Sequence, residues 1–297
     1  MQRQMMIEGF LDYLRYELRR SPLTVKNYAD DLRAFERFFK NLNGQISWES
    51  VDGDVIRDWM ESMMDRGNRA ASVNRRLSAL RSLYHFARAR HLIDKDPAHG
   101  IEAPKKEKPL PLFLKENDMD RLLDETAWGT DYVDVRDRTI IMTFYETGVR
   151  LSELIGLTDG DIDWTGCQLK VTGKGNKQRI IPFGEELSEA LSHLIQVRDS
   201  EVESLDDALF LTSRGRRMSQ SQVRSEVKRR LAGACTLKKM SPHVLRHTFA
   251  TAMLNHGATI ESVKRLLGHE SVSTTEIYTH TTFEQLKRVY QDAHPRA

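Results

Sequence analysis

The sequence has few cysteines, few prolines and no long apolar segment. Cys167 and Cys235 are the two cysteines among 297 residues, too few and too far apart to suggest a disulfide framework or a metal site. There is no early apolar run with a cleavage site, and no apolar run long enough to span a bilayer. We therefore expect a protein of the reducing cytoplasm that does not partner with a membrane.

A strong net charge is also lacking. The formal charge is +2, with 30% charged and 39% hydrophobic residues, as in an ordinary soluble globular protein. Two stretches depart from this balance. Residues 66–90 carry seven arginines and no acid, and residues 214–246 carry ten lysines or arginines against the single acid Glu226. Local basic patches attract phosphate backbones, so both stretches predict DNA contacts, with a solvated helix face as the alternative.

The periodicity of the first hundred residues is helical throughout and predicts a bundle of four helices. The third helix is expected over Asp54 to Asp65, and the fourth over Ser72 to Arg90 with Ser72 as its N-cap. The stretch IEAPKKEKPLPL is rich in proline and lysine and reads as a linker. We therefore expect an N-terminal domain over residues 1–103, a linker over 104–112 and a second domain over 113–297.

The second domain combines helical patterns with short alternating stretches that are typical of strands. Two strands flank a glycine-rich hairpin turn that has Lys174 at its tip. The fold class expected here is mainly α, with a small three-stranded antiparallel sheet. The expected helices are Lys115 to Glu125, Asp134 to Thr147, Leu151 to Leu157 and Glu185 to Asp199, and the expected strands are Cys167 to Val171, Gln178 to Pro182 and Ala208 to Thr212.

Residues able to act on a phosphate gather between Ser241 and His280. His243 and Arg246 are three apart on a helix that Ser241 and Pro242 should start. A second helix should run from Thr259 to Gly268, directly before His269, and Tyr278 follows a Ser/Thr-rich turn. Taken singly, the tyrosine is more often a packing residue, and the arginine more often part of a surface ion pair.

A further arginine occupies a position that its backbone should hold firmly. Arg150 comes just after Gly148, which should end a helix, and Glu153 could orient it through a charge-assisted hydrogen bond. This arrangement suits a phosphate clamp. A plain helix pair is the alternative for Arg150 and Glu153, and a solvated side chain is the alternative for Lys174.

Four blocks together resemble the signature of a known family. ETGVRLSEL, VTGKGNKQRIIP, HVLRHTFAT and LLGHESVSTTEIYTH occur in the order and at separations similar to those of the tyrosine recombinases of the phage integrase family, in particular the bacterial XerC/XerD type. The first half of the chain resembles the SAM-like, DNA-clamping domain of that family more loosely.

The resemblance implies a site-specific recombinase that works without a metal, another cofactor or ATP. Tyr278 would be the nucleophile that forms a 3′-phosphotyrosyl link, and Lys174 would be the general acid. His243 would assist proton movement and contact the phosphate, and His269 would hydrogen-bond to the phosphate and position it. Arg150 and Arg246 would hold the phosphate in place of divalent ions, with Glu153 in support. The DNA contacts expected from the basic stretches and the hairpin are Arg75, Arg76, Arg81, Arg88, Lys177, Arg179, Arg216 and Arg217.

The same resemblance implies a tetramer on double-stranded DNA that passes through a Holliday junction, with or without a second, related recombinase. A short helix from Phe283 to Val289 would dock on the neighbouring subunit, or on its own domain as the simpler alternative. Two other functions stay open at this point. A type IB topoisomerase would use similar chemistry on one duplex, and an architectural DNA-binding protein would keep the basic patches without cutting.

Overall fold

The computed structural model describes residues 2–42, 44, 46–105, 112–234, 240–268 and 280–297. The chain divides into two compact units, residues 1–109 and 110–297, and each is described here by itself. Within the described residues, no helix is both long and apolar enough to cross a membrane.

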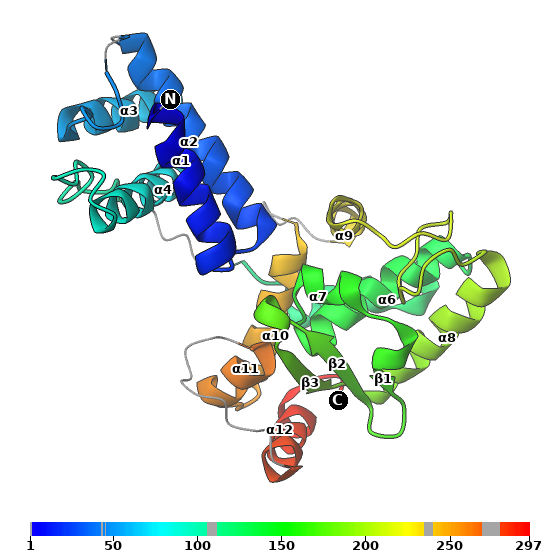
Figure 1. Cartoon of the computed structure of the whole chain (residues 1–297). Helices are drawn as coiled ribbons and strands as arrows, with labels where there is room; N and C mark the ends of the chain where they lie inside the picture. Colours follow the sequence, from blue (N-terminus) through cyan, green and yellow to red (C-terminus); the bar gives the residue numbers. More distant parts are fainter. Residues whose placement is uncertain (1, 43, 45, 106–111, 235–239, 269–279) are drawn as a thin grey trace. The chain divides into compact units, whose positions relative to one another are not determined.

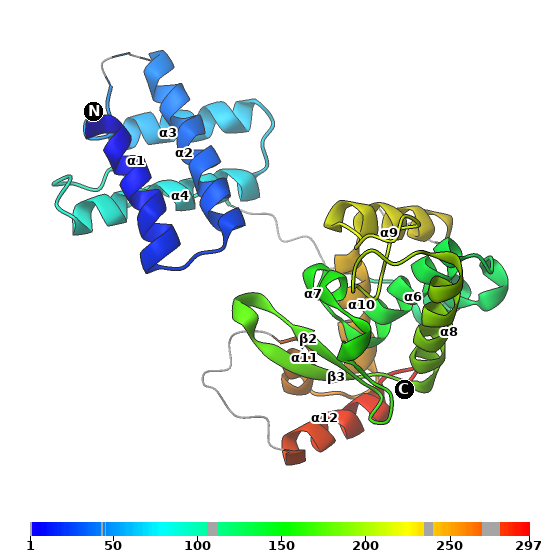
Figure 2. The ribbon, with the colours of Figure 1, turned by 45° about the vertical axis from the view of Figure 1, so that its right-hand side comes forward.

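The N-terminal unit is a bundle of four helices (Figures 1 and 2). Its core is rich in aromatic rings: Phe35 lies 4.8 Å from Trp59 and 5.6 Å from Trp48 between ring centroids. The fourth helix begins earlier than expected, with Arg69 rather than Ser72 at the N-cap, because the two alanines that follow Arg69 favour helix. The helices are α1 (Gln2–Asp12, continued by a π-helical turn Tyr13–Glu17), α2 (Pro22–Leu42), α3 (Gly53–Asp65) and α4 (Ala70–Ala89).

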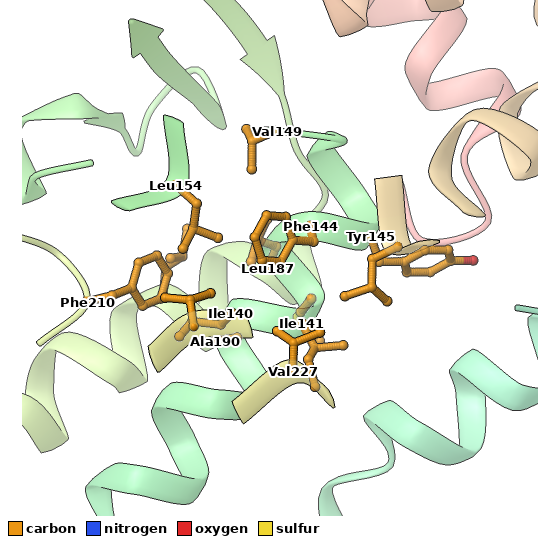
Figure 3. Close-up of a cluster of buried hydrophobic side chains, with 14 of the residues drawn as sticks. Ile140, Ile141, Phe144, Tyr145, Val149, Leu154, Leu187, Ala190, Phe210 and Val227 are labelled. Carbon is orange, nitrogen blue, oxygen red and sulfur yellow. The ribbon is translucent and has the colours of Figure 1, made fainter. Parts of the chain in front are cut away.

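The second unit is built around α6, a helix that is buried along almost its whole length. It packs against α8 and α10, and Figure 3 shows part of the resulting core, including Ile140, Phe144 and Leu187. The hydroxyls of Thr139 and Thr143 donate to carbonyls one turn earlier, so these buried polar groups are satisfied. The helices are α5 (Glu116–Leu123), α6 (Tyr132–Thr147), α7 (Leu151–Gly156), α8 (Glu185–Glu201), α9 (Gln220–Ala234), α10 (Pro242–Asn255), α11 (Ile260–Leu267) and α12 (His280–Ala293).

The sheet is antiparallel with the order β1-β2-β3, formed by Ile162–Asp163, Gln168–Thr172 and Gln178–Pro182. The prediction of a strand at Ala208 to Thr212 is wrong, because this segment makes only single β-bridges, at Ala208 and Leu211. All residues from Ala208 to Leu211 are buried, so the segment fills the core instead of showing the alternation of a sheet edge. The mainly α fold class with a small three-stranded antiparallel sheet is confirmed, with Ile162–Asp163 as the third strand.

Helix α9 was not expected from the basic stretch that contains it. Its apolar residues Val223, Val227 and Leu231 recur every four positions and are buried, which is a helical signal that the surrounding arginines and lysines obscure.

Helix α12 packs on its own unit. Leu286, Tyr290 and Ala293 join a cluster with Phe249 of α10 and Leu266 of α11. The packing of this terminal helix agrees with the simpler of the two alternatives, and the helix is longer than the expected Phe283 to Val289.

A buried polar contact ties α12 to α6. The Tyr290 hydroxyl donates to Glu146 Oε2 at 3.4 Å, and the Gly184 backbone N–H donates to the same oxygen at 3.2 Å. Glu146 Oε1 has no hydrogen-bond partner among the described residues. Burial is the largest cause that raises the pKa of Glu146 to about 8, so this carboxyl is mainly protonated at neutral pH.

We predict that Glu146→Gln stabilises the chain at pH 8 and has little effect at pH 5. The pKa of Glu146 is about 8 when folded and 4.5 in its reference state, so its contribution to stability is fully present below pH 4.5 and lost as the pH rises through 8. The glutamine side chain does not ionise, so the difference in free energy of unfolding between Glu146→Gln and wild type should grow by about 1 kcal/mol per pH unit in this window. Urea unfolding at pH 5, 6.5 and 8 measures it. The exposed Glu189→Gln is the control, and parallel profiles for Glu146→Gln and wild type would contradict the prediction.

Candidate functional site

Arg150 is fixed at the junction between α6 and α7. It is the N-cap residue of α7, and its backbone N–H donates to Glu153 Oε2 at 2.7 Å. Its guanidinium donates to Glu153 Oε1 at 2.8 Å and to the Gly268 carbonyl at 2.7 Å. The side chain is still 37% exposed, so one face is open to a ligand. The expected pairing of Arg150 with Glu153 is present in the structure.

Glu153 is fully buried beneath Arg150 and is shared with a second arginine. Arg179 of β3 donates to Glu153 Oε1 at 2.7 Å and to Oε2 at 2.9 Å. Burial by itself raises the pKa of Glu153, but the hydrogen bonds and charge of Arg179, then those of Arg150, outweigh it and bring the pKa to about 2. Glu153 is therefore a carboxylate at any physiological pH.

Arg246 of α10 is held by carbonyl groups at two helix ends. It donates to the Gly148 carbonyl and, at 2.7 Å, to the Leu267 carbonyl. Gly148 is the left-handed C-cap residue of α6, and Leu267 is the last residue of α11. Burial and then the positive charge of Arg150 lower the pKa of Arg246 to about 10, so it stays charged near neutral pH. Helix C-termini carry partial negative charge, which suits a cation there.

Arg150 and Arg246 lie close enough for their positive charges to repel each other. Both guanidiniums reach the C-terminal end of α11, Arg150 at the Gly268 carbonyl and Arg246 at the Leu267 carbonyl. Each is positive, and the charge of Arg150 opposes that of Arg246. An anion placed between them would relieve this repulsion, and guanidiniums match the oxygens of a phosphate in bidentate fashion.

His243 lies one turn before Arg246 on α10, and its side chain is partly buried and partly open to solvent. Partial burial of the ring, followed by the positive charges of Arg224, His247 and Arg246, lowers the pKa of His243 below 6.5. The imidazole is therefore neutral near pH 7 and can accept a proton from a neighbouring group. The helix start at Ser241 and Pro242 agrees with the sequence, although the Ser241 side chain makes no capping bond.

Lys174 lies in the hairpin between the second and third strands, as its sequence context predicts. The backbone of Lys174 lies in the turn Lys174–Asn176 between β2 and β3, where Gly175 has a φ of 73°. The Gly173 N–H donates to the Lys177 carbonyl at 2.8 Å and closes this turn. His269 and Tyr278 lie outside the described residues.

The arginines of α4 divide into anchored and open ones. Arg75 and Arg76 both pair with the buried Asp31 of α2, with Arg75 Nη2 at 2.9 Å from Asp31 Oδ1. Arg81 donates to the Ile101 carbonyl, whereas Arg88 is exposed. Their role as DNA contacts stays a prediction.

The predicted contacts of the second unit divide in the same way. Lys177 and Arg216 are exposed, while Arg217 pairs with Asp207 and donates to the Ile155 carbonyl at 2.7 Å. Arg179 does not have the position of a DNA contact: its side chain is 7% exposed and its donors are directed at Glu153 and the Leu266 carbonyl. The reason is that every second residue of β3 points into the core, and Arg179 falls on that face.

Backbone carbonyl groups that were not predicted from the sequence complete the site. The carbonyls of Gly148, Leu267 and Gly268 accept from the two arginines. The glycines that end α6 and α11 were recognised as helix stops, but an acceptor role for their carbonyls has no sequence signal of its own.

Comparison with known families and proteins covers almost the whole chain. Residues 112–285 match the model of the "Phage integrase family", and residues 7–91 match that of the "Phage integrase, N-terminal SAM-like domain". The chain is 39% identical over 291 residues to tyrosine recombinase XerC of Escherichia coli O139:H28, covering 98% of this chain and 96% of the relative. It is 35% identical over 294 residues to tyrosine recombinase XerD of Oceanobacillus iheyensis, covering 98% of each.

The fold also matches a solved structure. The Tn1549 transposon integrase in complex with circular intermediate DNA aligns with a TM-score of 0.71 at 20% identity, covering 94% of this chain and 98% of that one. At this identity the match concerns the fold alone.

We predict that Gly148→Ala is more destabilising than Gly257→Ala. Both glycines have positive φ, 59° and 91°, so each alanine costs about 1 kcal/mol of backbone strain. A Cβ at Gly148 would also lie 2.5 Å from a Phe249 ring carbon, whereas nothing lies within 4 Å of one at Gly257. We expect an additional loss of about 1–3 kcal/mol for Gly148→Ala in urea unfolding. Equal losses for the two variants would show that the contact with Phe249 is easily relieved.

Proposed function

We propose that this chain, which belongs to the phage integrase family and is a site-specific tyrosine recombinase, cleaves DNA with Tyr278 as the nucleophile and Arg150 and Arg246 as the phosphate clamp. The observation that carries this assignment of residues is the convergence of the two arginines on the C-terminal end of α11. The chain continues from there towards His269 and Tyr278.

The proposed cleavage step exchanges one phosphodiester for another. The Tyr278 phenolic oxygen attacks phosphorus, and the bond from phosphorus to the 5′ oxygen breaks, leaving a 3′-phosphotyrosine. The phenol loses its proton, and Lys174 gives a proton to the departing 5′ oxygen. The clamp stabilises the negative charge that grows on the nonbridging oxygens.

His243 suits the removal of the phenolic proton. A free phenol has a pKa near 10 and attacks poorly at neutral pH without help. The lowered pKa of His243 keeps its ring neutral, and Arg246 one turn away places the phosphate beside it. His269 would hydrogen-bond to the phosphate and position it, completing the set taken from the sequence.

Rejoining reverses the same bonds. A 5′ hydroxyl attacks the phosphotyrosine and releases Tyr278, so the phosphodiester count is unchanged and no ATP is needed. We propose that four protomers act on two sites through a Holliday junction, with room in the tetramer for a second, related recombinase, and that the protein works in the cytoplasm. The domain limits of 1–103, 104–112 and 113–297, and DNA contacts from Arg75, Arg76, Arg81, Arg88, Lys177, Arg216 and Arg217, belong to the same proposal.

The alternatives are not favoured. The XerC and XerD relatives match the chain from end to end at 35–39% identity, which supports recombination over relaxation by a type IB topoisomerase. An architectural protein would not require two arginines, Arg150 and Arg246, to converge on one helix end with a buried carboxylate, Glu153, behind one of them.

We predict that wild-type protein becomes covalently linked to a nicked duplex carrying its recombination site, in EDTA. Host genomic fragments, nicked near inverted repeats so that the cleaved end diffuses away, would be run on a denaturing gel. We expect a protease-sensitive shifted band for wild type and none for Tyr278→Phe, because phenylalanine has no oxygen to attack phosphorus.

The matched control is Tyr290→Phe, which removes the hydroxyl of a buried tyrosine on α12 and leaves the proposed nucleophile in place. It should retain the covalent band. A band from Tyr278→Phe, or its loss in Tyr290→Phe with an unchanged melting temperature, would contradict the assignment. No band from wild type, despite binding in a native gel, would favour the architectural alternative.

A further inference from the structure

We propose that Arg179 is a positioning residue, which keeps the charge of Arg150 available to the scissile phosphate and joins Glu153 to the hairpin and to the end of α11. This inference rests on the proposed function, because it assigns a role to a residue behind the phosphate clamp.

The first support is the completeness with which Arg179 is buried and bonded. Two of its nitrogens reach the two oxygens of Glu153, and its Nε donates to the Leu266 carbonyl at 3.0 Å. Only 7% of the side chain is exposed. A buried cation is costly unless its donors are paired. This complete set of hydrogen bonds therefore indicates that Arg179 has a fixed structural position.

The second support is charge. Arg150 and Glu153 alone would form a neutral pair, since one positive and one negative group face each other at 2.8 Å. With Arg179 at 2.7 Å from the same carboxylate, two positive groups share one negative group, and the trio carries a net charge of +1. Glu153 can therefore orient Arg150 without cancelling the positive charge that a phosphate would meet.

The third support is connectivity to the hairpin that carries Lys174. Arg179 lies in β3, and the turn that closes between Gly173 and Lys177 precedes it directly. A Cβ on Gly173 would lie 3.2 Å from Glu153 Oε1 and 3.9 Å from Arg179 Nη1. The base of the hairpin, at Gly173, therefore lies against the buried ion pair of Glu153 and Arg179.

The fourth support is connectivity to the end of α11. Arg179 holds the Leu266 carbonyl, Arg246 holds the Leu267 carbonyl and Arg150 holds the Gly268 carbonyl. A Cβ on Gly268 would meet the Arg179 side chain at 3.1 Å. Three successive carbonyls are therefore bound by three arginines, and Arg179 supplies the buried one.

The test compares single-turnover cleavage by wild type, Arg179→Met and Arg179→Lys with that of Arg198→Met and Arg198→Lys. Arg198 is the matched control: its side chain is 6% exposed, it binds Asp159 through two nitrogens at 2.8 and 2.7 Å, and it donates to the Leu209 carbonyl. Among the described residues, the hydrogen-bond partners of Arg150 and Arg246 include neither Asp159 nor Leu209. Each variant is assayed at a fixed interval below its own melting temperature.

We expect Arg179→Met to slow formation of the covalent complex by about 100-fold through misplacement of Arg150, and Arg198→Met to leave the rate within about threefold of wild type. Arg179→Lys should recover part of the rate, because it restores the charge but not the fork that spans Glu153 and the Leu266 carbonyl. If Arg179→Lys and Arg179→Met both form the covalent complex at the wild-type rate, the proposal is overturned. If Arg179→Met does not fold, Arg179→Lys decides alone, with a wild-type rate again overturning it.

A second readout separates positioning from general support. A methylphosphonate at the scissile position replaces one charged oxygen with a neutral methyl group, so less positive charge is needed in the clamp. The loss in Arg179→Met should shrink to about tenfold on this substrate, relative to wild type on the same substrate. An equal loss on both substrates would contradict the proposal that Arg179 keeps the charge of Arg150 available to the phosphate. If wild type forms no covalent complex on either substrate, the proposed function itself fails, and this inference fails with it.

Discussion

The second unit depends on one buried carboxylate. Glu153 has no exposed side-chain surface, yet it is ionised, because two guanidiniums and one backbone N–H satisfy its oxygens. Removing either arginine would leave a buried charge short of partners, which is among the most costly changes to a folded chain. The two chain segments that supply these donors, Arg150 at the start of α7 and Arg179 in β3, are consequently held in one arrangement.

Helix ends complete what the carboxylate begins. α6 and α11 both stop at a left-handed glycine, and each presents its last carbonyls to an arginine from another segment. Those carbonyls have no partner within their own helix, so the arginines satisfy groups that would otherwise need water. The arginines gain fixed positions in return. Under the proposed function, a phosphate that binds here would meet cations whose orientation is already set, and this would lower the reorganisation that accompanies cleavage.

Local chemistry made much of this arrangement predictable. Thr259 caps α11 through its side chain and Gly268 ends it, and the sequence showed both because capping depends on neighbouring residues alone. The hairpin strand Gln178 to Pro182 was predicted for the same reason, from alternation within the strand. Ala208 to Thr212 was assigned wrongly, because a short apolar run looks the same in a sheet as in the space between helices. Only its surroundings in the folded unit distinguish the two.

The basic residues show most clearly where sequence reasoning stops. A run of arginines predicts a field that attracts DNA, but it does not say which arginines are already neutralised by acids far along the chain. Asp31 binds Arg75 across 44 positions, and Glu153 binds Arg179 across 26. An acidic side chain neutralises an arginine when the two lie within a few ångströms of each other in the folded chain. Nothing in the local sequence encodes that proximity. The same residue type therefore serves two purposes, with buried acids holding some arginines as scaffold while exposed ones such as Arg216 remain available to a phosphate backbone.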